Sequence, residues 1–323
     1  MSARALRLLP VVAWVRLLAC TDAAAAFGAE PPHFQVPATA GDGPFVFVAY
    51  GDTRFTQREK VANAYARRAL VERIAKEHPA AILIGGDLVY DGSDSHDYQT
   101  YKTETAAWAS QNIPVYPALG NHELQACGDP SPCLENWWTA LSPLPLRPYR
   151  WYSVSIGPSV LALVLDSDSA LKPGSEQRIW FEKQILGADQ SVKFILILLH
   201  YPPVRDPLIP RAREEAEVAS YLAHNAAKLR QRVVVVGSHV HNYERYLRNG
   251  VPYLVSGGGG AKPVRSLRIF GERSGLHTSV NFHYIRFTLE GGRLSGTMVR
   301  FDASPLVPSP WTEPDHFEVK AKD

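Results

Sequence analysis

The feature that most constrains the fold is a series of short apolar runs, each of which ends directly in a polar side chain. The runs FVFVAYGD, AAILIGGD, ILILLH and VVVVGSH have the length and the Val and Ile content of buried strands. Segments with helical periodicity separate the runs over the first two thirds of the chain, and strands dominate afterwards. This order predicts an α/β fold in which mixed sheets are covered by helices. With 323 residues, 46% of them apolar, the chain can bury a large core in one domain.

The polar residues at the ends of the runs are of the kinds that bind metal ions. In α/β sheets the carboxyl ends of the strands form the ligand crevice, so we expect these side chains to converge. Carboxylate, amide oxygen and imidazole together suit Zn, Mn or Fe better than Ca or thiolate-binding metals. The donors outnumber the ligands of one ion, which favours two ions bridged by an aspartate. The candidates are Asp52, Asp87, Asn121, His122, His200, His239 and His241.

The ordered set GD, GDLVY, GNHE, LLHYPP, SHVHNYER and SGGGGA resembles the calcineurin-like metallophosphoesterase superfamily. Within that superfamily the set is most similar to the purple acid phosphatases, and it extends from Val46 to about Ala261. The resemblance implies two packed mixed β-sheets flanked by helices. It also implies dinuclear metal-dependent hydrolysis of phosphate esters, with phosphomonoesters favoured, through in-line attack by a metal-bridging hydroxide.

Carried over residue by residue, the resemblance assigns a role to each candidate. The first metal ion would be held by Asp52, Asp87, Tyr90 and His241, and Asp87 would bridge to the second ion. The second ion would be held by Asn121, His200 and His239. His122 would act as the acid or polarising group near the leaving oxygen. The tyrosine implies Fe(III) at the first position, with a divalent Fe, Zn or Mn ion at the second.

The sequence departs from the family pattern at two positions. Purple acid phosphatases usually have Asp-X-Gly at the first strand, whereas this chain has Asp52-Thr53-Arg54. The Arg54 guanidinium has two interpretations: it grips a phosphate, or it pairs with a nearby acid such as Glu123. At the second position Ser238 stands where a glycine usually precedes the first histidine of the pair, and we expect it to reshape a tight turn.

Two rival functions stay open at this point. One is a phosphodiesterase on the same fold that uses Mn or Zn, and Tyr90 would then be a packing residue. The other is a metal-binding module without turnover. Every predicted ligand position is filled and His122 is present, which favours an enzyme. The substrate, the metal ions in the cell and the oligomeric state do not follow from the sequence.

The chain divides into four expected regions. Residues 1–27 have the basic start and apolar run of an export signal. Residues 28–43 are rich in Pro, Gly and Ala and are expected to be a linker. The metallophosphoesterase domain is expected over residues 44–303, and a Pro-rich tail over residues 304–323.

Two cleavage patterns compete in the signal region. LLAC resembles a lipoprotein signal that would place a lipid anchor on Cys20, and AAAAF offers an ordinary cleavage site. The protein is therefore expected to be exported, whether periplasmic, lipid-anchored or secreted. Cleavage before Cys20 removes three arginines, which leaves 31 of the 34 basic residues against 32 acidic ones. A chain so near neutrality is not expected to bind nucleic acid, and it is expected to touch a membrane only through such an anchor. The resemblance implies a small-molecule phosphate ester as its partner.

Two further cysteines, Cys127 and Cys133, bracket the segment GDPSP. In an oxidising compartment they are expected to form a disulfide, because their number is even and the chain is expected to be exported. Two free thiols on a loop are the alternative.

Overall fold

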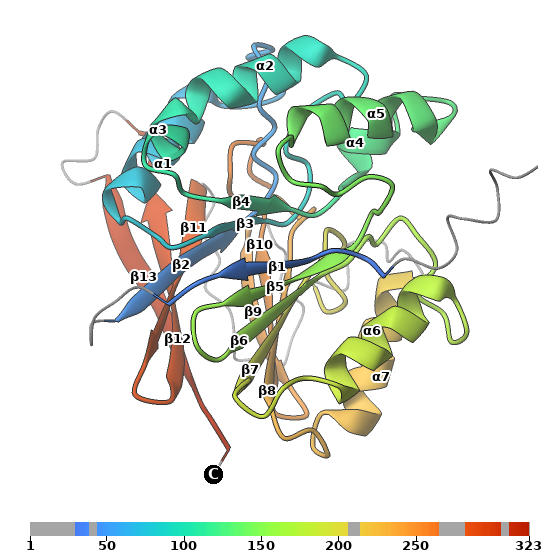
Figure 1. The fold of residues 1–323 in the computed structure, drawn as a ribbon. Helices are drawn as coiled ribbons and strands as arrows, with labels where there is room; N and C mark the ends of the chain where they lie inside the picture. Colours follow the sequence, from blue (N-terminus) through green and yellow to red (C-terminus); the bar gives the residue numbers. More distant parts are fainter. Residues whose placement is uncertain (1–29, 39–43, 206–213, 265–281, 305–309, 323) are drawn as a thin grey trace, which may run out of the picture. The chain divides into compact units, whose positions relative to one another are not determined.

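A computed structural model describes residues 30–38, 44–205, 214–264, 282–304 and 310–322. The chain divides into Met1–Glu30 and Pro31–Asp323, and all the helices and strands described below belong to the second unit (Figure 1). Cys20 and the predicted signal lie outside the described residues. Among the described residues, none of the helices has both the length and the apolar character that crossing a membrane requires.

The first of two sheets in the described residues has seven strands in the order β1-β5-β6-β7-β8-β10-β9. Strands β6, β7, β8 and β10 run parallel to one another. Strands β5 and β6 form a hairpin around Gly157 and Pro158. The strands are β1 (His33–Val36), β5 (Tyr152–Ile156), β6 (Val160–Val164), β7 (Phe194–Leu198), β8 (Arg232–Gly237), β9 (Tyr243–Arg248) and β10 (Val251–Ser256).

The second sheet has six strands in the order β13-β12-β11-β2-β3-β4. Strands β2, β3 and β4 are parallel, and β11, β12 and β13 are antiparallel. The β11–β12 turn contains Gly291 and Gly292, both at positive φ, as an EGG hairpin requires. The strands are β2 (Phe45–Tyr50), β3 (Ile82–Ile84), β4 (Val115–Pro117), β11 (Phe282–Glu290), β12 (Arg293–Phe301) and β13 (Trp311–Lys320).

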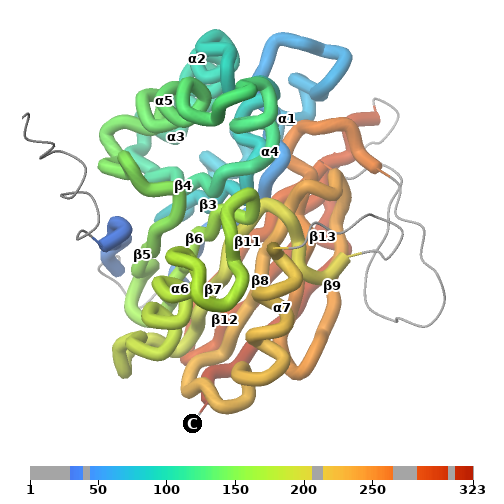
Figure 2. The backbone as a smooth tube through the Cα atoms, turned by 90° about the vertical axis from the view of Figure 1, so that its right-hand side faces the viewer, coloured from blue at the N-terminus to red at the C-terminus, as the bar shows by residue number. Residues whose placement is uncertain are grey.

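Helices cover the outer faces of both sheets, as Figures 1 and 2 show. Several begin after a capping side chain: Asn63 accepts a hydrogen bond from the Ala66 N–H, and Asp94 accepts one from the His96 N–H. The helices are α1 (Ala64–Lys76), α2 (Ser95–Glu104), α3 (Ala106–Ser110), α4 (Asn121–Leu124), α5 (Pro130–Ala140), α6 (Glu176–Leu186) and α7 (Glu214–Asn225).

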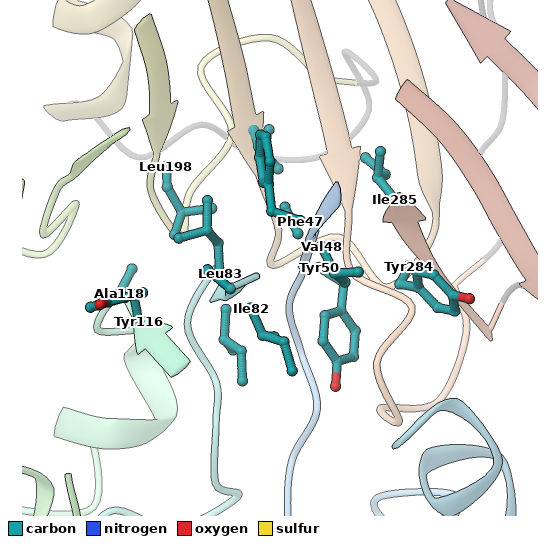
Figure 3. Close-up of a cluster of buried hydrophobic side chains, with 14 of the residues drawn as sticks. Phe47, Val48, Tyr50, Ile82, Leu83, Tyr116, Ala118, Leu198, Tyr284 and Ile285 are labelled. Atoms are coloured by element: carbon teal, nitrogen blue, oxygen red, sulfur yellow. The ribbon is translucent and has the colours of Figure 1, made fainter. Parts of the chain in front are cut away.

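Alternate residues of the seven-stranded sheet belong to two buried clusters. In β7, Leu196 and Leu198 pack in the cluster that contains Phe47 of the other sheet, whereas Ile195 and Ile197 pack with α6 and α7. Figure 3 shows part of the first cluster, where Leu198 and Leu83 come from different sheets. Because side chains alternate along a strand, this sheet lies between the other sheet and a helical layer. With α1, α2 and α3 over the six-stranded sheet, the four layers confirm the predicted fold (Figure 2).

The structure corrects two expected boundaries. His33–Val36, expected in a linker, form strand β1, which pairs in parallel with β5. Trp311–Lys320, expected in a trailing tail, form strand β13, which pairs with β12. Pro314 lies within β13, and a sheet tolerates proline there because β13 is an edge strand.

The segment between Cys127 and Cys133 contains the start of helix α5. Asp129 caps α5 by accepting a hydrogen bond from the Ser131 N–H, and Pro130 occupies the first helical position. The predicted disulfide between Cys127 and Cys133 is present, and it ties the preceding loop to the first turn of α5.

Candidate metal centre

Strand ends from both sheets meet at one end of the described unit. In the six-stranded sheet, the parallel strands β2, β3 and β4 lead to Asp52, Asp87 and Asn121. In the seven-stranded sheet, β7 and β8 lead to His200 and His239. Backbone hydrogen bonds join the two sheets here, from the Gly51 N–H to the Ser256 carbonyl at 2.8 Å for example. The ends of buried parallel strands therefore place the predicted donors in one region.

Several of these residues have strained backbones. Asp52, Asp87 and His239 have φ values of 55°, 50° and 65°, and Arg54 has 45°. Residues other than glycine seldom adopt this left-handed region, at a cost of about 1–2 kcal/mol each. Such strain persists where the surrounding structure enforces it, and it gathers at functional sites.

Ser238, expected to reshape a turn, instead fills a space between two glycines. Its hydroxyl donates a hydrogen bond to the Ser256 carbonyl at 3.1 Å. A Cβ atom at Gly51 would lie 2.2 Å from the Ser238 Oγ, and one at Gly85 would lie 2.3 Å from it. The serine side chain therefore fits because both neighbouring strand ends carry glycine.

The second donor set consists of Asn121, His200 and His239, whose donor atoms converge. The His200 Nδ1 donates to the Gly85 carbonyl at 2.9 Å, so the Nε2 of the neutral ring carries no proton. That Nε2 lies 2.9 Å from the Asn121 Oδ1 and 3.2 Å from the His239 Nδ1. The His239 Nδ1 is also 3.2 Å from the Asn121 Oδ1. Electron-rich atoms that converge in this way are suited to a cation.

The first donor set contains a carboxylate that lacks hydrogen bonds. This set consists of Asp52, Asp87 and His241. Asp52 is fully buried, and neither of its side-chain oxygens has a hydrogen-bond partner among the described residues. The His241 Nδ1 donates to the Lys262 carbonyl at 2.9 Å, so its Nε2 is free to coordinate, and it lies 3.5 Å from the Asp52 Oδ1. A buried polar group without a partner requires an explanation, and a bound ion supplies one.

Asp87 lies between the two donor sets. Its Oδ1 is 3.3 Å from the His200 Nε2 and accepts a hydrogen bond from the His122 N–H at 3.0 Å. Ligand atoms of Asp52, Asp87 and His200 all lie within 4.8 Å of one another. A bridging ligand would lie in such a position, and the bridging role of Asp87 stays a prediction.

Burial lowers the pKa of each histidine in the donor sets. The pKa of His239 falls to about 3, because of burial first and of the neighbouring His200 next. The pKa of His241 falls to about 4 through burial and the charge of Arg54, and burial also lowers the pKa of His200. The three rings are therefore neutral at neutral pH, the form in which imidazole binds metal ions.

The two aspartates have opposite shifts. Burial raises the pKa of Asp52 well above its ordinary value, and the negative charge of Asp87 raises it further. Burial also acts to raise the pKa of Asp87, but His200, His122 and Arg54 outweigh it and hold that pKa low. The residues thus fit a metal centre, because a buried anionic carboxylate lies between the two donor sets, beside a second carboxylate without partners and neutral imidazoles.

The structure places the other predicted site residues on one flank of this centre. The His122 Nδ1 donates to the Tyr90 carbonyl at 2.6 Å, and the two rings are 5.0 Å apart. The guanidinium groups of Arg54 and Arg58 lie 5.9 and 5.3 Å from the centre of the Tyr90 ring. These contacts put Tyr90 beside the centre, and its role as a ligand stays a prediction.

Arg54 pairs with Asp87 rather than with Glu123. The Arg54 Nη2 lies 3.2 Å from the Asp87 Oδ2. Glu123 is unsuited as a partner because its buried carboxylate accepts hydrogen bonds from three backbone N–H groups, those of Asp87, Val89 and Gly120.

Glu123 is a positioning residue whose role the sequence analysis missed. It fixes the backbone on both sides of Asp87 and at the start of α4, where Asn121 and His122 lie. Its place at the third position of α4, where an acidic side chain often reaches back to the capping residue, was the available signal.

A family profile described as calcineurin-like phosphoesterase matches residues 41–243 of this chain. The match covers more than half of the sequence and includes the strand ends described above. The chain belongs to the calcineurin-like phosphoesterase family and is a metallophosphoesterase, a hydrolase. A search of curated proteins finds no match.

Solved structures share the fold at low sequence identity. A purple acid phosphatase from yellow lupin (Lupinus luteus) seeds is 19% identical, with a TM-score of 0.69 over 87% of this chain and 54% of that one. The chain thus spans about half the length of the lupin protein. A dimetal phosphatase from Danio rerio is 15% identical, with a TM-score of 0.60 over 87% of this chain and 100% of that one. GAP50, described as the anchor in the inner membrane complex of Plasmodium, is 15% identical, with a TM-score of 0.55 over 87% of this chain and 90% of that one.

Proposed function

We propose that the protein hydrolyses phosphate monoesters at a centre of two metal ions. The observation that carries this proposal is the meeting of unprotonated His200 Nε2 with the oxygens of Asn121 and Asp87, next to a buried Asp52 without hydrogen bonds. Family membership supports a phosphoester bond as the target. Asp52, Asp87, His241 and Tyr90 would hold one ion, and Asp87 with the second donor set would hold the other.

When bound, such ions supply a water molecule activated at neutral pH and neutralise charge on the phosphate. The chain's own residues orient the reaction. His122 is fixed by its Nδ1 hydrogen bond to the Tyr90 carbonyl, and its Nε2 lies 3.9 Å from the Asp87 Oδ2. That nitrogen is positioned to hold a proton for the leaving oxygen, which is the role of a general acid.

The preference for monoesters over diesters is supported by Arg54. A monoester phosphate carries close to two negative charges at neutral pH, since its second pKa is about 6. A diester carries one charge, so a monoester benefits more from a cation outside the metal ions. The Arg54 side chain is 13% exposed and lies next to Asp87, where its guanidinium can meet two phosphate oxygens.

We further propose Fe(III) in the first donor set, with Tyr90 as a phenolate ligand. The support is the spacing of Tyr90 from Asp87 and the position of its ring beside His122. A phenolate is an anionic oxygen donor that favours ferric iron. The iron-loaded protein should show a visible tyrosinate-to-iron absorption band, and Tyr90→Phe should abolish the colour. An active, iron-replete protein without the band would make Tyr90 a packing residue.

Metal analysis of natively purified protein, together with monoester and diester assays, tests the proposed function. We expect two ions per chain and faster hydrolysis of the monoester. A diester preference with Mn or Zn would identify a phosphodiesterase. Two bound ions without turnover of either ester would identify a metal-binding module.

We also propose that the protein is exported. The disulfide between Cys127 and Cys133 supports an oxidising compartment. Mass spectrometry of the mature N-terminus distinguishes an acylated Cys20 from a chain cut after it. An intact N-terminus on cytoplasmic protein would contradict export.

A further inference from the structure

The Asn121 side chain can bind a metal ion through only one of its two ends. Its Oδ1 is an acceptor, whereas its Nδ2 carries two hydrogens and offers no lone pair to a cation. In the structure the Oδ1 faces the second donor set, 2.9 Å from the His200 Nε2 and 3.2 Å from the His239 Nδ1. A turn of the amide by about 180° would therefore remove the oxygen of Asn121 from that set.

In a metal-stripped protein, His200 would favour the opposite orientation of this amide. The His200 Nε2 carries no proton, because the Nδ1 of the ring donates to the Gly85 carbonyl, so the Asn121 Oδ1 meets another acceptor there. If the amide were turned over, its N–H would donate to the same Nε2 and a hydrogen bond would be gained. The orientation that suits a metal ion therefore needs a partner that holds the Asn121 Nδ2 on its other side.

Gln125 supplies that partner from one helical turn further along the chain. Its Oε1 accepts a hydrogen bond from the Asn121 Nδ2 at 3.1 Å. The Gln125 N–H also donates to the Asn121 carbonyl at 2.8 Å at the end of α4, so backbone and side chain join the same two residues. Side chains four residues apart on a helix are neighbours, and a hydrogen bond between glutamine and asparagine at this spacing is favourable.

The backbone that carries Gln125 is tied to the neighbouring helix. The Cys127 N–H donates to the Leu124 carbonyl at 3.2 Å, and the disulfide joins Cys127 to the buried Cys133 of α5, which packs beside α4 (Figure 1). The Gln125 side chain is exposed, so water competes for its Oε1. The tied backbone offsets this competition, because less conformational freedom is lost when the side chain is held in one geometry.

We propose that Gln125 is a positioning residue of the second donor set, which holds the Asn121 amide with its oxygen toward the metal ion. This inference rests on the proposed function, because it needs that ion to bind. The role requires an acceptor at position 125, which a glutamate provides and a methionine of similar length provides only weakly. It also requires an amide at position 121, because an aspartate there would offer an oxygen to the ion in either orientation.

The test measures the binding of zinc ions to the metal-stripped protein by calorimetric titration, for the wild type, Gln125→Met and Gln125→Glu. In Gln125→Met the affinity for one of the two ions should fall by about tenfold, the lower end of the range for residues that orient metal ligands. Gln125→Glu should retain at least the wild-type affinity. In an Asn121→Asp background, Gln125→Met should have no effect, whereas the loss of a merely structural residue would weaken binding in both backgrounds.

Gln99→Met is the matched control, because Gln99 is exposed and its Nε2 donates to the Thr103 hydroxyl four residues further along α2, at 3.4 Å. It should leave both zinc affinities unchanged. Unchanged affinities in Gln125→Met would overturn the inference, and so would a loss in Gln125→Glu equal to that in Gln125→Met. These two outcomes decide even if Asn121→Asp fails to fold. A loss of the same size in the Asn121→Asp background would also overturn it.

Hydrolysis of p-nitrophenyl phosphate, measured on the same samples, tests the proposed function separately. A wild type that binds two zinc ions without turnover would contradict that function alone. A wild type that binds no zinc ion would contradict both.

Discussion

The two donor sets of the metal centre differ in the charge that they bury. In the second set, neutral imidazoles of His200 and His239 meet the amide oxygen of Asn121, so no net charge is buried. In the first set, Asp52 is buried without hydrogen bonds, next to a second carboxylate, Asp87. The second set can fold with little cost, whereas the first set needs a cation to offset its buried charge.

Because of this difference, loss of metal from the first set should lower stability as well as activity, whereas loss of metal from the second set should lower activity alone. A cation bound to the first set relieves the charge of Asp52, so its binding free energy also stabilises the fold. Loss of a second-set ligand leaves neutral groups behind, so the fold should survive.

The largest effect is expected from His200→Ala or Asn121→Ala. Each variant should lose one metal ion and at least about 10²-fold in kcat/KM, the scale for removing one electrostatic stabiliser of a transition state. Metal analysis and far-UV circular dichroism should show one ion and an intact fold. His224→Ala, an exposed histidine on α7, is the control. Near-normal turnover with both ions retained would contradict the assignment.

Glu123→Gln should weaken metal binding to both donor sets, because Glu123 fixes the backbone around Asp87 and at Gly120. A glutamine has one acceptor oxygen for three N–H donors, so at least one donor loses its partner. Metal affinity should fall by about 10- to 100-fold, as for residues that orient metal ligands. Calorimetric metal titration measures this, with the exposed Glu72→Gln as control. Unchanged affinity would make Glu123 a purely structural residue.

Asp52→Asn should stabilise the metal-stripped protein by about 1–3 kcal/mol, the scale for removing a buried group without partners. The folded pKa of Asp52 is raised, so the folded state holds a proton that the unfolded state releases above about pH 4. The stability of the metal-stripped wild type therefore falls as pH rises from about 4, and the advantage of Asp52→Asn should grow over the same range.

Urea unfolding in the presence of a chelator, at several pH values, measures this advantage. Glu72→Gln removes an exposed carboxylate and should show no such trend. With metal ions restored the order should reverse, because only the wild type binds the first ion fully. An advantage that does not change with pH would mean that folding does not raise the pKa of Asp52.

The smallest effect concerns Arg54, which has φ of 45°. Arg54→Gly and Arg54→Ala both remove the guanidinium and should raise KM for phosphate esters alike. Only glycine relieves the left-handed backbone, so Arg54→Gly should be more stable than Arg54→Ala by about 1 kcal/mol. Equal stability would mean that the backbone strain is absent, and unaltered inhibition by phosphate would make Arg54 structural.

The strands that have a recognisable pattern in their own residues could be predicted from the sequence. The runs that end at Asp52, Asp87, His200 and His239 are buried on both faces, so they are apolar throughout and end abruptly at the site. The N-terminal strand His33–Val36 has no such signal, because it is four residues long and follows two prolines. Its partner strand β5 lies more than a hundred residues away, so only tertiary pairing makes it a strand.

The candidate metal ligands could be predicted from the sequence, but the residues that position them could not. Asn121 and His122 belong to a motif that can be read locally, whereas the N–H partners of Glu123 at Asp87 and Val89 are more than thirty residues away.

The most direct test of the account is anomalous X-ray scattering from crystals of natively purified protein. We expect two peaks about 3.5–4 Å apart on either side of Asp87, which is the spacing of two-metal hydrolases. One peak should contact Asp52 and His241, and the other should contact Asn121, His200 and His239. A single peak, or none, in crystals of protein that retains full phosphatase activity would contradict the division into two donor sets.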